Sequence, residues 1–185
     1  MSKQEQALET RQRLLTAAIT TMQEHGIAAL TLDAVAKEAK ISKGGLLHHF
    51  ASKNALIEAI LRHLFADFES RVQAYYDAEP DQPGRWLRAY VRATYDDAPL
   101  PLEVASMLMS AMSENRALLT LIQTDFEQWQ RRLVDDGLST ARATVIRQAA
   151  DAYWTERLLG VAPDRQADRL QVRDELLRLT YEETR

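Results

Sequence analysis

Apolar residues recur every three or four positions along most of this chain, with polar residues between them. This spacing predicts α-helices, because it gathers apolar side chains on one face of a helix. A first helix is expected to end near His25, where Gly26 is a suitable C-cap, and a long helix to run from Lys53 to about Ala78. Proline and glycine in the segment 79–84 then interrupt the pattern.

The chain after Gly84 is also expected to be helical. The expected ranges are about 85–96, 102–112, 115–135, 139–159 and 164–180. Short turns separate these ranges, as in a compact helical domain, and no alternating pattern typical of strands occurs. We therefore predict an all-α fold of about nine helices.

Residues 31–53 predict two short helices around a tight turn. The apolar positions at helical spacing are Leu32, Val35, Ala36 and Ala39 in the first helix and Ile41, Leu46 and Phe50 in the second. Thr31 and Ser42 are expected to cap the two helices, because each hydroxyl can accept a hydrogen bond from a free backbone NH of the first turn. Such a pair is typical of a helix-turn-helix, whose second helix enters the major groove of DNA.

Gly44 and Gly45 lie within the expected second helix, although each costs up to about 1 kcal/mol there relative to alanine. Two missing side chains beside Lys43 would let the positive helix N-terminus lie close to a phosphate or sugar. The alternative is that both glycines form a loop and the helix begins at Leu46.

This region resembles the DNA-binding domain of the tetracycline-repressor (TetR) family. The residues that carry the resemblance are Gly26, Thr31, Leu32, Val35, Ala36, Ile41, Ser42, Lys43, Gly44, Leu46, His49, Phe50 and Lys53. They cover about the first third of the chain, and the remainder is similar to the family only in length and helical character. The resemblance implies a three-helix DNA-binding domain at residues 1–52, joined by the long helix to a helical effector-binding and dimerisation domain at residues 53–185.

The resemblance also implies which residues contact DNA. They are Thr31, Ser42, Lys43, Gly44, Gly45, Leu47, His48, His49 and Lys53. Lys43 and Lys53 are expected to bind phosphates, or a guanine edge in the case of Lys43. Family members commonly carry an aromatic residue where this chain has Leu47, so base reading is expected to differ there. The alternatives are a solvated His48 and a His49 buried between helices.

Composition sets limits on where such a protein acts. The chain has no cysteine, so a reducing compartment such as the cytoplasm is expected. Its N-terminal segment is polar and no apolar run approaches the roughly 20 residues of a membrane span, so export and membrane insertion are not expected. The net charge is -4, but residues 1–65 hold eight basic and six acidic side chains against 15 and 21 in the rest. The basic surplus thus lies with the helix-turn-helix.

The second half is rich in aromatic and methionine side chains, which suit an adaptable apolar cavity. The candidate effector-binding residues are Trp86, Tyr90, Met107, Met112, Phe126, Trp129 and Tyr153. The alternative is that they form plain core. The resemblance implies that an unknown small molecule shifts the population away from the DNA-binding state. The function expected is therefore a repressor released from its operator, although the direction of control is open.

The last two helices are expected to form a pairing surface. Its candidate residues are Val145, Ala149, Ala152, Leu170, Leu176 and Leu177. These faces could instead close the core of a single chain, but the resemblance favours a homodimer, and a two-fold dimer matches a palindromic operator on double-stranded DNA.

Two other functions stay open at this stage. The four histidines have no metal-binding spacing, and motifs typical of nucleophiles, phosphate loops or dinucleotide sites are missing from the sequence, so we predict no catalytic residue, metal or cofactor. A histidine-dependent enzyme is therefore the least favoured alternative. The other is a helical adaptor whose helix-turn-helix binds protein.

Overall fold

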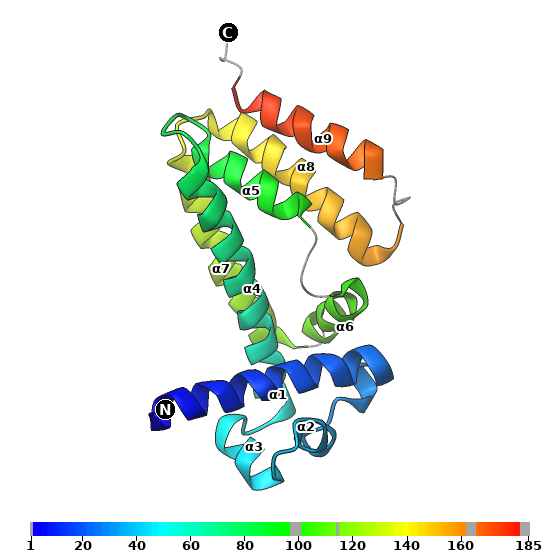
Figure 1. Cartoon of the computed structure of the whole chain (residues 1–185). Coiled ribbons are helices and arrows are strands. Elements are labelled where there is room, and N and C mark those ends of the chain that lie inside the picture. Colours follow the sequence, from blue (N-terminus) through cyan, green and yellow to red (C-terminus); the bar gives the residue numbers. More distant parts are fainter. Residues whose placement is uncertain (1, 97–100, 114, 162–165, 182–185) are drawn as a thin grey trace. The chain divides into compact units, whose positions relative to one another are not determined.

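The computed structural model describes residues 2–96, 101–113, 115–161 and 166–181. Within these residues the chain is all-α, as predicted, and no strand is present. The helices are α1 Lys3–His25, η1 Ile27–Ala29 (a single 3-10 turn), α2 Leu32–Glu38, α3 Lys43–His49, α4 Lys53–Ala78, α5 Arg85–Tyr95, α6 Leu102–Ser113, α7 Arg116–Val134, α8 Thr140–Leu159 and α9 Gln166–Leu179 (Figure 1).

The chain forms two compact units, and α4 contributes residues to both. The first unit comprises Met1–Leu64 and Leu100–Asn115, and the second comprises Phe65–Pro99 and Arg116–Arg185. The predicted domain boundary, between residues 52 and 53, coincides with the start of α4, whereas the two compact units divide inside α4. The predicted boundary therefore stays a prediction.

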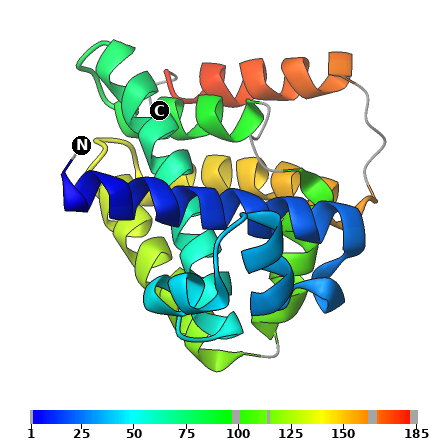
Figure 2. The same cartoon turned by 60° about the horizontal axis from the view of Figure 1, so that its bottom comes forward.

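The first unit is built around α1. Helix α2 packs against both α1 and α3, and α6 packs against α1 and η1 (Figure 2). The fully buried side chains of this unit are Leu14, Ala18, Met22, Leu30, Val35, Leu46, Leu56, Ile60 and Val104. These residues fix the helix-turn-helix on a solid core, because burial of apolar surface is the main stabilising contribution to folding.

Local sequence signals set the helix ends of the first unit. The NH of Gly26 closes α1 by donating to the carbonyl oxygen of Met22 at 2.9 Å, with a φ of 77° that favours glycine. Thr31 caps α2 by accepting from the NH of Ala34, as predicted. These caps supply acceptors and donors that the helix itself cannot.

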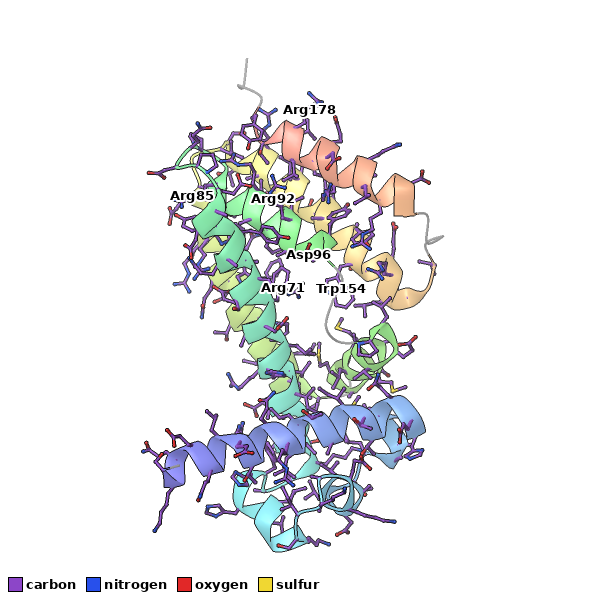
Figure 3. The ribbon with its side chains drawn as sticks, in the orientation of Figure 1. Arg71, Arg85, Arg92, Asp96, Trp154 and Arg178 are labelled. Atoms are coloured by element: carbon purple, nitrogen blue, oxygen red, sulfur yellow. The ribbon has the colours of Figure 1, made fainter. Side chains whose placement is uncertain are left out.

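The second unit is centred on α5, which packs against α7, α8 and α9. Its core residues are Val72, Trp86, Leu87, Ala89, Tyr90, Val91, Ala93, Tyr95, Leu133, Ala143, Ile146, Ala150, Leu176 and Leu177. The later part of α4 is tied to the end of α5, since Arg71 donates to the carbonyl oxygen of Ala93 and the hydroxyl of Tyr75 donates to Asp96 (Figure 3).

A buried charge network joins the end of α4 to α5. Arg88 has no solvent-exposed surface, and its Nε donates to Glu79 Oε2 at 2.9 Å. A second Arg88 nitrogen donates to the carbonyl oxygen of Pro83, while Arg92 donates to the other Glu79 oxygen at 2.7 Å. Burial alone would raise the pKa of Glu79, but the hydrogen bonds from Arg92 and Arg88 lower it. The segment that interrupts the helical pattern is therefore a fixed corner.

Candidate DNA interface and effector core

Helix α3 begins at Lys43, so Gly44 and Gly45 lie inside it and the loop alternative is wrong. Ser42 is the N-cap, and its hydroxyl accepts from the NH of Gly45 at 3.1 Å. The caps predicted at Thr31 and Ser42 are both present, and both residues are exposed. A capped helix with an exposed first turn is suited to anion binding through its NH groups.

The two glycines of α3 differ in what surrounds them. A Cβ at Gly44 would meet no atom within 4 Å. A Cβ at Gly45 would lie 2.9 Å from Cγ2 of Ile41 and 3.2 Å from the capping oxygen of Ser42. Close packing inside the chain therefore explains why a residue without a side chain stands at position 45. At position 44 the chain leaves room for a Cβ.

The turn between α2 and α3 has a feature that the sequence did not reveal. Lys40 has a φ of 55°, in the left-handed region that side chains other than glycine rarely adopt. The NH of Ile41 donates to the carbonyl oxygen of Ala36 across this turn, and Arg13 of α1 donates to the carbonyl oxygen of Ala39. These bonds hold the left-handed residue in place.

Both lysines that were expected to bind phosphates already have partners in the chain. The ammonium of Lys43 pairs with Asp33 of α2, and both side chains are largely exposed. The ammonium of Lys53 donates to the carbonyl oxygen of Ile27 at 3.1 Å and is partly buried. Lys53 thus ties the start of α4 to η1, and its contact with phosphate stays a prediction.

The end of α3 places its two histidines in different surroundings. His48 is exposed, whereas His49 is half-buried, and their ring centroids lie 5.6 Å apart. Burial, followed by electrostatic interaction with His48 and Arg11, lowers the pKa of His49 below its ordinary value. Arg11 also lies over the ring of Phe50. Leu47 is exposed, as a base contact would require.

Five of the seven candidate effector-binding residues lie in the second unit. Four rings there form an aromatic cluster: Phe68, Trp86, Tyr90 and Trp129, with Trp86 stacked on Tyr90 at 5.1 Å and the other contacts edge to face. Phe65 adds an edge contact to Trp129. The indole NH of Trp129 donates to Glu69 at 3.0 Å. Met107 and Met112 lie instead on α6 of the first unit, because α6 packs against α1.

A polar group lies beside this cluster. The hydroxyl of Tyr90 donates to Asp151 at 2.5 Å, and Arg147 pairs with the same carboxylate. Burial raises the pKa of Asp151 despite these two partners, and burial together with the Asp151 charge raises the pKa of Tyr90 well above 10. Arg147 lies over the ring of Phe126, at 4.7 Å from its centroid.

The ring of Tyr153 stacks on a residue outside this aromatic cluster. It stacks on Tyr95 with ring centroids 4.2 Å apart and an interplanar angle of 8°. Burial, followed by the charge of Tyr153, raises the pKa of Tyr95 to about 12. Its hydroxyl therefore stays protonated at any ordinary pH.

The candidate pairing surface divides between core and solvent. Leu176 and Leu177 are only 6% and 8% exposed and belong to the core of the second unit, which leaves little of either side chain to contact a partner, so their place on an interface stays a prediction. The reason is that α9 packs against α5 and α8 within the same chain. Ala149 is partly buried against that core, whereas Val145, Ala152 and Leu170 are exposed.

The described residues contain no cluster of metal-binding side chains. None of their helices is long and apolar enough to cross a membrane.

Two family models match the chain. Residues 14–60 match the model of bacterial regulatory proteins of the tetR family, and residues 84–181 match the tetracyclin repressor-like C-terminal domain. The chain belongs to the TetR family. Members of this family are DNA-binding transcriptional regulators rather than enzymes, which sets the enzyme alternative aside.

Sequence relatives and solved structures agree with this assignment. The transcriptional regulator BetI of Burkholderia thailandensis is 32% identical over 105 residues, which are 57% of this chain and 54% of BetI. The chain thus spans about half the length of the curated relatives it matches. A TetR-family member from Streptomyces coelicolor is 25% identical with a TM-score of 0.69, over 94% of this chain and 99% of the other. The multidrug-binding protein EbrR, solved with ethidium, is 25% identical with a TM-score of 0.66, over 92% and 98%.

Proposed function

We propose that this protein is a ligand-responsive, sequence-specific transcriptional regulator of the cytoplasm, a repressor that a small molecule releases from a palindromic operator. The observation that carries the proposal is α3, a capped and exposed helix with Lys43 and Gly44 in its first turn, set on the core of a TetR-family domain. Family membership and the name of the BetI relatives support the same function.

The DNA contacts proposed from the sequence lie on α3 and its N-cap, at the N-cap of α2 and at the first residue of α4. Thr31 and Ser42 present helix N-termini, Lys43 presents an ammonium, and Leu47 and His48 are exposed for base edges. Gly45, His49 and Lys53 stay part of the proposed interface, and each also has a contact inside the chain: Gly45 with Ile41, His49 with the His48 ring, and Lys53 with the carbonyl oxygen of Ile27.

Homodimerisation through α8 and α9 is part of this proposal. Val145, Ala152 and Leu159 are seven residues apart on α8, so they lie on one side of the helix, and all three are exposed. Leu170 and Val172 add exposed apolar side chains on α9. A surface of this kind is buried in a two-fold dimer, which would present two α3 helices to the two halves of a palindrome.

The effector is proposed to bind at the aromatic cluster of the second unit. The cluster draws on α4, α5 and α7, and residues of α4 belong to both units, so repacking of these rings would act on a helix that begins directly after α3. EbrR was solved with ethidium and with malachite green, which supports an aromatic ligand for a protein of this fold. Release from DNA requires a shift in population between two conformational states, so the effector must bind better to the state that does not bind DNA.

The proposal is tested by selecting duplexes from a random-sequence pool with the purified protein. An inverted repeat is expected to be enriched, and its affinity is expected to fall steeply as salt is added. Because no other protein is present, such binding also argues against a protein-binding adaptor. If no duplex is enriched, the proposed function is wrong.

The dimer is tested separately by sedimentation of the wild type and of Val145→Glu. The wild type is expected to sediment as a dimer and the variant as a folded monomer with weaker DNA binding. A wild type that stays monomeric at all concentrations would remove the dimer from the proposal.

A further inference from the structure

The side chain of Arg147 is almost fully buried, yet the Nε–H on one edge of its guanidinium has no hydrogen-bond acceptor among the described residues. One terminal nitrogen donates to Asp151. A guanidinium offers donors along two edges, and a carboxylate matches such an edge with two parallel hydrogen bonds. The Nε edge of Arg147 is therefore a place where an acidic group could bind.

A second buried donor is left unpaired in the same group of residues. The indole NH of Trp86 has no acceptor in the described part of the chain, although the residue is only 5% exposed. Trp86 stacks on Tyr90, whose hydroxyl donates to Asp151. Both unpaired NH groups thus belong to side chains connected to Asp151, Arg147 directly and Trp86 through Tyr90.

Unpaired buried donors are uncommon, because each loses its hydrogen bond to water without replacement. Trp129 provides the contrast within the same cluster, since its indole NH donates to Glu69. An unpaired NH is therefore not a general property of this cluster, and each of the two donors lacks an acceptor among the described residues.

The Arg147 end of this group lies near solvent. Phe126, whose ring lies against the Arg147 guanidinium, is 38% exposed, and the Asp151 side chain is partly exposed as well. A large apolar ring that is left exposed beside a buried charge can be covered by a ligand that also reaches that charge. This gives a ligand both a ring to stack on and a route to the donors.

From this arrangement we propose that the effector is an aromatic carboxylate, whose acidic group accepts hydrogen bonds from the Nε edge of Arg147 and whose ring packs against Phe126 and the aromatic cluster. The proposal rests on the proposed function, because it specifies the ligand of the same effector site. The Trp86 NH serves as a further donor to the bound acid. Asp151 and Tyr90 position the guanidinium so that this edge stays available.

The test uses three probes of equal size and different charge: 2-naphthoate, 2-naphthamide and 2-naphthylmethylamine. Binding to the full chain is measured by calorimetry, without DNA. Naphthoate is expected to bind at least about tenfold more tightly than the neutral amide, the range that charge-assisted hydrogen bonds give. Equal binding of all three, preference for the amine, or binding of none would each overturn the assignment.

Substitutions test which side chain binds the acidic group of the ligand. Arg147→Lys keeps the charge beside Asp151 but lacks the guanidinium edge, and it is expected to lose about tenfold in naphthoate affinity with little change in amide affinity. Trp86→Phe removes the indole NH together with part of the ring that stacks on Tyr90, and it is expected to weaken naphthoate binding several-fold and more than it weakens amide binding. Unchanged naphthoate binding by Arg147→Lys would overturn the proposal.

Arg157→Lys is the matched control, because Arg157 lies on the same helix and contacts Tyr153 rather than Asp151. It is expected to leave the affinity for naphthoate unchanged. Thermal unfolding checks that every variant is folded. Failure of these binding tests with an intact selected operator would refute only the effector class, whereas failure of the duplex selection would refute the regulator itself.

Discussion

The ammonium nitrogen of Lys43 lies 2.9 Å from both carboxylate oxygens of Asp33. The pair joins the first turn of α2 to the first residue of α3, at the exposed end of the helix-turn-helix. In the proposed interface, DNA phosphates compete with this carboxylate for Lys43. An acid that occupies a DNA-binding lysine should therefore lower the affinity for DNA.

Asp33→Asn is accordingly expected to tighten binding to the selected duplex by up to about fivefold, the range of an exposed ion pair. Fluorescence anisotropy of a labelled duplex measures the change. Glu38→Gln removes one negative charge from the same helix and is the control, expected to have a smaller effect.

A double-mutant cycle tests whether Asp33 affects DNA binding through Lys43. Lys43→Ala alone is expected to weaken binding and to reduce the salt slope by about 1, as for one lost phosphate contact. Asp33→Asn should then have little effect in the Lys43→Ala background. An equal gain in both backgrounds would mean that Asp33 acts by general repulsion and not through Lys43.

The surroundings of the two glycines predict opposite results for one substitution. Gly44→Ala adds a methyl group in open space and is expected to stabilise the fold by up to about 1 kcal/mol. The same variant should bind the duplex several-fold more weakly if the backbone approaches DNA there. Gly45→Ala, whose methyl group would press on Ile41, is expected to lower stability instead. Unfolding in urea and anisotropy measure the two properties, and unchanged affinity for Gly44→Ala would exclude close approach.

The buried corner at Glu79 predicts a pH-dependent stability. The pKa of Glu79 is lowered in the folded state, so its contribution is present above the ordinary value of 4.5 and is lost as pH falls through the folded value. Glu79→Gln leaves the charge of Arg88 buried and is expected to cost about 3 kcal/mol or more at neutral pH. Urea unfolding at neutral and acidic pH should show that the difference from wild type shrinks in acid.

A matched control for this corner is Glu58→Gln, which removes an exposed ion pair with Arg62 on α4. It is expected to cost no more than about 0.5 kcal/mol. A similar cost for both substitutions would show that burial adds little to the Glu79 network.

The left-handed conformation of Lys40 predicts a stabilising substitution. Lys40→Gly relieves the positive φ and is expected to raise the free energy of unfolding by up to about 1 kcal/mol, after the extra chain entropy of glycine is subtracted. Lys40→Ala removes the same charge but keeps the strain, so it should give no gain. Thermal unfolding distinguishes the two, and equal stability of both variants would place the effect elsewhere.

Helix positions and caps followed from the sequence because they depend on neighbouring residues. The spacing of apolar residues, Gly26, Thr31 and Ser42 are local signals, and the structure has the helices and caps they predicted. Contacts between residues far apart in the sequence could not be predicted in this way. The apolar face of α9 was clear, but periodicity does not tell whether Leu176 meets its own chain or another.

The ion pairs of charged residues were also not predicted from the sequence. Glu79 was placed in the break at residues 79–84 and Arg88 in the helix that follows, so the buried pair was not predicted, since charged side chains are seldom buried without a partner and the two lay in different elements. Met107 and Met112 were assigned to the second domain by position in the chain, whereas α6 packs with α1. The Asp33 partner of Lys43 was missed because ten residues and a turn separate the two.

All three tryptophans of the chain, Trp86, Trp129 and Trp154, lie in the second unit, while the first unit has none. The intrinsic fluorescence of this protein therefore reports on one unit alone. Trp86 and Trp129 sit within the aromatic cluster, and Trp154 lies on α8 (Figure 3). A change in emission on adding unlabelled operator DNA would thus be a direct optical signal that the effector half senses the DNA-bound state.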